Sequence, residues 1–176
     1  MGKIIWFTGL SGSGKTTIAE ALADRLKSTG KTVKILDGDA VRNIKHKHLG
    51  FSRDDIRENN RLIAEMAKTA GKRKDFVLVP IISPYRTDRA MAQEIIGNGF
   101  VELFINAPLE ECIKRDAKGL YKKALEGKID NFIGISPQNP YEPPQSPDLE
   151  IESANFSLEE NVNKIFNFLQ FERYEK

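Results

Sequence analysis

Apolar and polar positions along this chain form two kinds of run that alternate. Short continuous apolar runs are typical of strands buried on both faces, and longer runs with apolar residues three and four positions apart are typical of helices. Strands are expected at 3–8, 32–36, 76–82 and 101–105, and helices at 16–28, 54–71, 87–96, 108–115 and 158–171. This alternation predicts an α/β fold, a parallel sheet flanked by helices on both faces.

One long stretch, 117–148, breaks the alternation. It is rich in lysine and is interrupted by glycine and proline at Gly119, Gly127, Gly134, Pro137, Pro140, Pro143, Pro144 and Pro147. Stretches of this length inside a compact domain are usually functional or disordered. We interpret it as a lid over the substrates, with an inert surface excursion as the alternative.

Composition sets the broad class. The 176 residues suit one domain, 1–176, with a substantial core, and a net charge of +2 gives no reason to expect a nucleic-acid polymer or a membrane as partner. Cys112 is the only cysteine, so an intrachain disulfide is excluded and a buried apolar role is expected. No secretory leader and no apolar run of about 20 residues is present, so a cytoplasmic enzyme is expected.

The candidate chemistry begins with the run from Gly9 to Thr16, which matches the phosphate-binding pattern G-x-x-x-x-G-K-[ST] between a strand and a helix. Its backbone N–H groups can face a polyphosphate, Lys15 can reach the β- and γ-phosphates, and the Thr16 hydroxyl can ligate Mg²⁺. The alternative is a glycine-rich turn that happens to precede a lysine. The predicted ATP-binding residues are Gly9, Ser11, Gly12, Ser13, Gly14, Lys15, Thr16 and Thr17.

Two further polar motifs follow predicted strands: Asp37-Gly38-Asp39 and Ser83-Pro84-Tyr85-Arg86. Ligands of open α/β sheets bind beyond the carboxyl ends of the strands, so both motifs should face the same crevice as the phosphate loop. One of the two aspartates can lie near Mg²⁺, and the other can accept a proton from an attacking hydroxyl. A plain Asp-Gly turn is the alternative.

Taken in order and spacing, the motifs from about residue 3 to about residue 151 resemble those of adenylylsulfate kinases. The resemblance is carried by Gly9–Thr17, Leu36-Asp37-Gly38-Asp39, Val41-Arg42, Leu49-Gly50-Phe51-Ser52, Glu58-Asn59, Ile82-Ser83-Pro84-Tyr85-Arg86, Asp88-Arg89, Arg115-Asp116-x-Lys118-Gly119-Leu120-Tyr121, Gly134-Ile135 and Tyr141-Glu142-x-Pro144. It implies a P-loop kinase that transfers the γ-phosphoryl group of ATP, with Mg²⁺, to the ribose 3′-hydroxyl of a small nucleotide bearing an activated 5′ tail.

The resemblance also implies residue roles. Lys15, Asp39 and Ser83 are the expected catalytic residues, with Asp39 orienting and deprotonating the 3′-hydroxyl. Ser83 matches a serine that bacterial relatives phosphorylate, although direct transfer needs no intermediate and a hydrogen bond to the acceptor suits it better. Arg115 is expected on the ATP adenine, and Phe51 and Phe132 on either face of the acceptor base. The other expected acceptor contacts are Asp37, Arg42, Asn59, Ile82, Lys118 and Leu120.

The chain departs from the family pattern on the acceptor side. Ile56 stands where relatives have an arginine that contacts the anionic tail, Ile133 replaces a threonine, and the segment before Tyr141 is slightly longer. Arg53, three residues before Ile56, lies nearest the same helix face as a replacement charge. The acceptor is therefore either adenylyl sulfate or an analogue. The analogue is cytidine diphosphoramidate, whose kinase in bacterial capsule synthesis resembles this family.

Two other classes of function stay open from the residues alone. A small-metabolite P-loop kinase shares the size and the phosphate loop, and a non-catalytic nucleotide switch would keep Lys15 and Thr16 without needing Asp39. The phenylalanine-rich terminal helix, with Phe166, Phe168 and Phe171, can pack on its own sheet or on a second copy in a homodimer.

Overall fold

A computed structural model describes residues 1–45, 47–116 and 118–171. Its core is a five-stranded, all-parallel sheet in the order β2-β3-β1-β4-β5. The strands are β1 (Lys3–Thr8), β2 (Val33–Ile35), β3 (Phe76–Pro80), β4 (Phe100–Asn106) and β5 (Leu149–Glu152). The expected α/β fold with a parallel sheet is confirmed.

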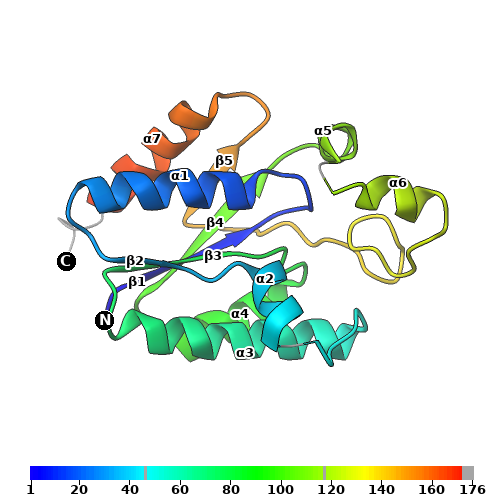
Figure 1. The fold of residues 1–176 in the computed structure, drawn as a ribbon, viewed down its shortest axis with the longest axis horizontal. Helices are drawn as coiled ribbons and strands as arrows, with labels where there is room; N and C mark the ends of the chain where they lie inside the picture. The colour runs from blue at the N-terminus through cyan, green and yellow to red at the C-terminus, as the bar shows by residue number, and fades with distance from the viewer. Residues whose placement is uncertain (46, 117, 172–176) are drawn as a thin grey trace.

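Helices cover both faces of the sheet (Figure 1). They are α1 (Lys15–Ser28), α2 (Gly38–Lys45), α3 (Arg53–Gly71), α4 (Arg86–Ile96), α5 (Leu109–Arg115), α6 (Leu120–Leu125) and α7 (Leu158–Phe171). In β1, Ile5 and Phe7 face α1 and α7, whereas Ile4 and Trp6 face α3 and α4. This two-sided burial explains why the central strands are continuous apolar runs.

The terminal helix α7 directs its apolar side to its own sheet. Val162, Ile165 and Leu169 are buried in the core beside α1, and Phe166 and Phe168 pack against it. The side chain of Phe171 lies outside the described residues. The helix therefore follows the first of its two expected uses.

Three elements were not predicted from the sequence: α2, α6 and β5. Asp37 caps α2, since its Oδ1 accepts hydrogen bonds from the backbone N–H groups of Asp39 and Ala40 at 3.0 Å each. Asp116 caps α6 in the same way, by accepting from the backbone N–H groups of Tyr121 at 2.9 Å and Lys122 at 3.0 Å. The predicted lid 117–148, whose residue 117 lies outside the described residues, thus contains a short capped helix.

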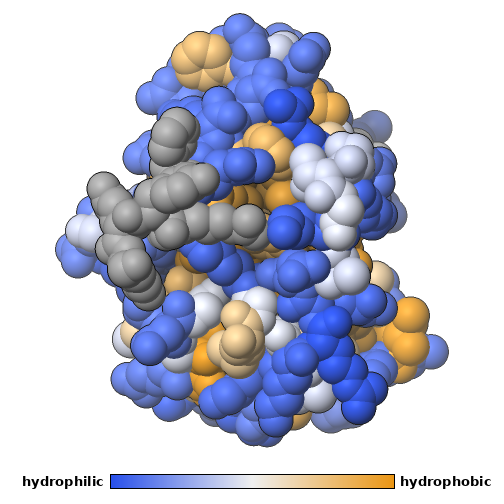
Figure 2. Space-filling model, turned by 90° about the vertical axis from the view of Figure 1, so that its left-hand side faces the viewer, coloured by the Kyte–Doolittle hydropathy of each residue, from blue (hydrophilic) through white to orange (hydrophobic). Residues whose placement is uncertain are grey.

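The end of the sheet where the strands begin lies on the left in Figure 1, beside the N-terminus, and faces the viewer in Figure 2. Its surface is mainly hydrophilic, with scattered apolar side chains. None of the helices in the described ranges is long and apolar enough to cross a membrane. The three predicted polar motifs lie at the opposite end, beyond the carboxyl ends of β1, β2 and β3.

Candidate active site

The phosphate loop turns sharply between β1 and α1. Gly14 adopts a left-handed conformation, with φ of 98°, immediately before the first residue of α1. A Cβ atom on Gly9 would come within 2.4 Å of the carbonyl oxygen of Ile105, so this position has room for glycine alone. The loop therefore packs directly against β4 and leads into the amino end of α1, where anions bind.

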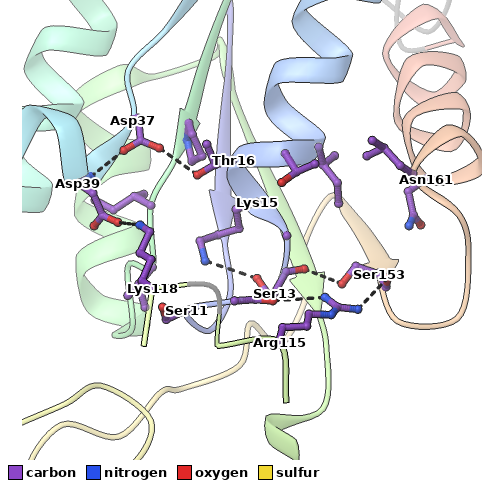
Figure 3. Close-up of a pocket in the computed structure, with 18 of the residues that line it drawn as sticks. Ser11, Ser13, Lys15, Thr16, Asp37, Asp39, Arg115, Lys118, Ser153 and Asn161 are labelled. Atoms are coloured by element: carbon purple, nitrogen blue, oxygen red, sulfur yellow. Dashed lines mark hydrogen bonds and ion pairs between the residues drawn. The ribbon is translucent and has the colours of Figure 1, made fainter. Parts of the chain in front are cut away.

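Lys15 is buried beneath this loop. Its Nζ donates to the carbonyl oxygens of Gly9 at 3.0 Å and Leu10 at 2.6 Å, and it lies 3.4 Å from Ser13 Oγ (Figure 3). Burial lowers the pKa of Lys15 to about 8, although the carboxylate of Asp39 opposes that change. The lysine is thus a desolvated cation at the centre of the loop, positioned to exchange carbonyl oxygens for phosphate oxygens.

This lowered pKa predicts a pH dependence of ATP binding. Only the protonated lysine attracts phosphate, and bound phosphate raises its pKa, so affinity should fall as pH rises above the free value of about 8. The terminal phosphate is already ionised above a pKa of about 6 and adds no change there. We expect the Kd of MgATP, measured by calorimetry, to rise roughly tenfold between pH 7 and pH 9. Lys15→Arg, whose guanidinium stays charged, should show a flat profile. A flat profile in the wild type would contradict the titration of Lys15.

Asp37 links the end of β2 to the phosphate loop. While its Oδ1 caps α2, its Oδ2 accepts a hydrogen bond from Thr16 Oγ1 at 2.9 Å (Figure 3). A hydroxyl and a carboxylate oxygen side by side suit Mg²⁺, which typically takes one or two protein oxygens and completes its shell with water and phosphate. No group of three or more His, Cys, Asp or Glu side chains within the described ranges could hold a metal ion by itself. The residues present therefore fit a nucleotide-bound Mg²⁺.

Asp39, in the first turn of α2, meets the predicted lid. Its carboxylate forms an ion pair with Lys118, which follows α5 in the chain (Figure 3). The same contact raises the pKa of Lys118. Both side chains are exposed, so the pair adds little to stability. The ion pair matters instead for the position of its two groups, because it places a carboxylate and an ammonium group together beside the phosphate loop.

These groups line one cavity of about 470 Å³. Of the residues predicted from the sequence, it contains Ser11, Gly12, Ser13, Gly14, Lys15, Thr16, Thr17, Asp37, Asp39, Ile82, Arg115 and Lys118. Gly9 lies just beneath, as an acceptor for Lys15. The predicted nucleotide residues and both aspartates are thus brought together.

The cavity also has a wall that sequence reasoning missed, formed by Ser153, Phe156, Leu158 and Asn161 at the β5–α7 connection. Ser153 Oγ donates to the carbonyl oxygen of Ser13 at 2.7 Å, and Arg115 donates to the carbonyl oxygens of Gly12 at 3.3 Å and Ser153 at 3.5 Å. The alternation of Leu149 and Ile151 with two glutamates was the available signal for β5. Arg115 therefore connects this wall to the phosphate loop.

The predicted acceptor residues outside the cavity lie on neighbouring elements. The guanidinium of Arg42 lies 4.6 Å from the centre of the Phe51 ring and donates to the Gly50 carbonyl, and Phe51 is 55% exposed. Phe132 packs edge-on against Tyr121, with ring centres 5.0 Å apart. Leu120 begins α6, and Asn59 is buried in α3. The two predicted rings thus come from two different segments, Phe51 from the α2–α3 connection and Phe132 from the predicted lid.

Ser83 is buried rather than placed on the cavity wall. It is 1% exposed and has a positive φ of 45°, and its Oγ has no hydrogen-bond partner among the described residues. Its carbonyl oxygen accepts from Arg89 at 2.7 Å. Ile82, the preceding residue, lines the cavity instead. A buried hydroxyl is poorly placed to receive a phosphoryl group in this conformation.

Ile56 and Ile133, the two positions expected to depart from the family pattern, lie together. Ile56, which is 2% exposed, and Ile133 pack with Tyr85 in one buried apolar cluster. Arg53, the expected replacement charge, makes a bidentate ion pair with the buried Asp88 at 2.7 and 2.8 Å. Its charge is therefore directed to Asp88.

Comparison with known proteins shows the family of the chain. The family model described as adenylylsulphate kinase matches residues 1–152. The chain is 48% identical to the adenylyl-sulfate kinase of Halothermothrix orenii over 98% of its own length and 92% of that protein. It is also 48% identical to the bifunctional enzyme NodQ of Rhizobium sp. strain BR816, of which it spans only 27%. The APS kinase of Mycobacterium tuberculosis, solved in complex with AMPPNP and APS, superposes with a TM-score of 0.92 at 40% identity, covering 96% of this chain and 98% of that one.

Proposed function

The chain belongs to the adenylylsulphate kinase family, and from that premise we propose that it phosphorylates the ribose 3′-hydroxyl of adenylyl sulfate. It is an ATP-dependent nucleotide 3′-phosphotransferase that uses Mg²⁺. The observation that carries the proposal is the Asp39–Lys118 pair in the same cavity as Lys15 and Thr16. A hydroxyl held by Asp39 there lies beside the loop that would hold the γ-phosphate. Because the reaction consumes ATP, we place it in the cytoplasm.

The residues divide the chemistry among them. Asp39 orients the 3′-hydroxyl and takes its proton as the 3′-oxygen bonds to the γ-phosphorus and the bond to the ADP oxygen breaks. Lys15 stabilises the negative charge on the transferring group. Thr16 and Asp37 would hold Mg²⁺, which neutralises phosphate charge when bound. Phe51 and Phe132 would stack on the acceptor base, and the segment 117–148 would close as a lid.

A second acceptor, cytidine diphosphoramidate, is favoured by one observation. The buried cluster of Ile56 and Ile133 offers no charge where relatives are expected to have one for the anionic tail, and Arg53 is paired with Asp88. Aromatic stacking does not discriminate between bases, because every base has a π-face. The altered position therefore allows a different tail and base with the same 3′-hydroxyl chemistry.

Release of ADP from MgATP, with each acceptor at the same low concentration, tests the proposal. We expect kcat/KM for adenylyl sulfate to exceed that for cytidine diphosphoramidate at least about tenfold, which corresponds to about 1.4 kcal/mol, because the chain is similar to enzymes named for adenylyl sulfate. The reverse preference would assign the enzyme to phosphoramidate metabolism and make Ile56 a specificity determinant. If neither adenylyl sulfate nor cytidine diphosphoramidate supports ADP release from MgATP, the proposed function is wrong.

A further inference from the structure

Asn139 lies in the segment between Gly134 and Tyr141, and it is almost completely buried. Only 3% of its surface is exposed. Its Nδ2 donates two hydrogen bonds, to the carbonyl oxygens of Phe51 at 3.0 Å and Asn131 at 2.7 Å. Its Oδ1 accepts one from Tyr85 Oη at 2.8 Å. Both amide protons and one acceptor position are thus satisfied by segments far apart in the sequence.

The two carbonyls that it joins lie at the two candidate base-binding rings. One belongs to Phe51 itself, and the other belongs to Asn131, the residue directly before Phe132. One amide group therefore spans the connection between the α2–α3 loop and the lid segment. Its two bonds fix how far apart the backbones of the two rings lie.

This bridge is anchored on the rigid side of the molecule. Tyr85, which donates to Asn139, packs with Ile56 and Ile133 and lies 4.0 Å beneath the guanidinium of Arg53. Arg53 is held in turn by Asp88, which is fully buried at the start of α4. Asn139 is thus held in place by residues of α3 and α4, the helices that cover one face of the sheet.

We propose that Asn139 is a positioning residue for the acceptor, one that sets the gap between Phe51 and Phe132 in which the nucleotide base binds. The inference rests on the proposed function, in which these two rings stack on the base. Stacking depends steeply on ring separation, so a gap that is not fixed weakens acceptor binding and leaves the ATP half of the site unchanged. Because Asn139 orders the two ring-bearing segments in the free enzyme, acceptor binding does not have to supply the conformational entropy of ordering them.

Asn139→Asp tests the proposal, because it keeps the size and the acceptor for Tyr85 but replaces the two donated protons with an oxygen. We expect KM for the preferred acceptor to rise at least about tenfold, with KM for ATP and kcat at saturating acceptor within about twofold. Asn167→Asp, the same change at an exposed position of α7, should alter none of these values. If thermal melting shows the Asn139→Asp variant unfolded at the assay temperature, Asn139→Ala, which adds no charge, is used for the same comparison.

The same measurement on Phe51→Ala distinguishes the positioning role of Asn139 from the stacking of the two rings on the base. A rise in acceptor KM for Phe51→Ala without one for the Asn139 variant overturns the positioning role alone. An unchanged acceptor KM for Phe51→Ala overturns the ring-stacking part of the proposed function. Equal losses in the ATP and acceptor constants of a folded Asn139 variant mean a general structural role and also overturn the inference.

Discussion

Replacing Lys15 with methionine should lower kcat/KM for ATP at least about 10³-fold while leaving the protein no less stable than the wild type. The loss of activity follows from removing the cation that stabilises the transferring phosphoryl group in a desolvated loop. The preserved stability follows from burial, which lowers the pKa of Lys15 from 10.5 to about 8. Holding the charged form in the folded state therefore costs on the order of 3 kcal/mol. Methionine has no such cost, although it leaves two loop carbonyls without their donor.

The sign of this stability effect depends on pH. A lysine whose folded pKa is lowered destabilises the folded state fully below about pH 8, and the penalty disappears as pH approaches the unfolded value of 10.5. The melting temperature of Lys15→Met, measured relative to that of the wild type, should thus be highest at pH 7 and should decrease by pH 9.5. Lys27→Met, an exposed lysine near the end of the same helix, should change neither activity nor this difference. If the difference in melting temperature between Lys15→Met and the wild type is the same at pH 7 and pH 9.5, the predicted cost of burying the charged lysine is wrong.

The sequence predicts best those elements whose burial leaves a clear apolar pattern. These are the helices buried along one face and the strands buried on both faces. The central strands β1 and β3 are apolar throughout because α1 and α7 cover one face of the sheet and α3 and α4 the other. Edge strand β5 contributes only Leu149 and Ile151 in four residues, which is too short for periodicity to separate it from a loop. Because β5 was not predicted, the cavity wall that begins at Ser153, the residue directly after this strand, was not predicted either.

The candidate site was predictable to the extent that it is written in local motifs. The phosphate loop fixes Lys15 and Thr16 by spacing alone, and strand ends bring Asp37 and Asp39 to the same edge. The pairing of Asp39 with Lys118, and of Asn139 with Phe51, joins segments separated by dozens of residues. Such contacts depend on the folded path of the segment from 118 to 148, and no periodicity encodes them. The same limit applies to Ser83, whose burial follows from packing and not from its place after β3.

Replacing Asp39 with asparagine should lower kcat about 10²- to 10³-fold and leave KM for ATP within a few-fold. Asparagine keeps the shape of the side chain but cannot take the proton of the 3′-hydroxyl. The fold should be unaffected, because the ion pair with Lys118 is exposed and such pairs contribute about 0–1 kcal/mol. Single-turnover measurements, with melting curves to confirm folding, test this expectation. Asp24→Asn, at an exposed position of α1, provides the matched control.

The Asp39–Lys118 pair raises a second explanation that the same assay can separate. If Asp39 acted only by holding the lid through Lys118, then Lys118→Met would reproduce the loss, and the double variant would be no slower than either single variant. A proton acceptor predicts instead that Lys118→Met mainly raises KM for the acceptor, and that Asp39→Asn still lowers kcat in the Lys118→Met background. Retention of wild-type kcat in Asp39→Asn would exclude the proton-transfer role altogether. That result would leave orientation by the phosphate loop and Lys15 as the source of the rate, because a loose phosphoryl-transfer transition state makes little demand on a base.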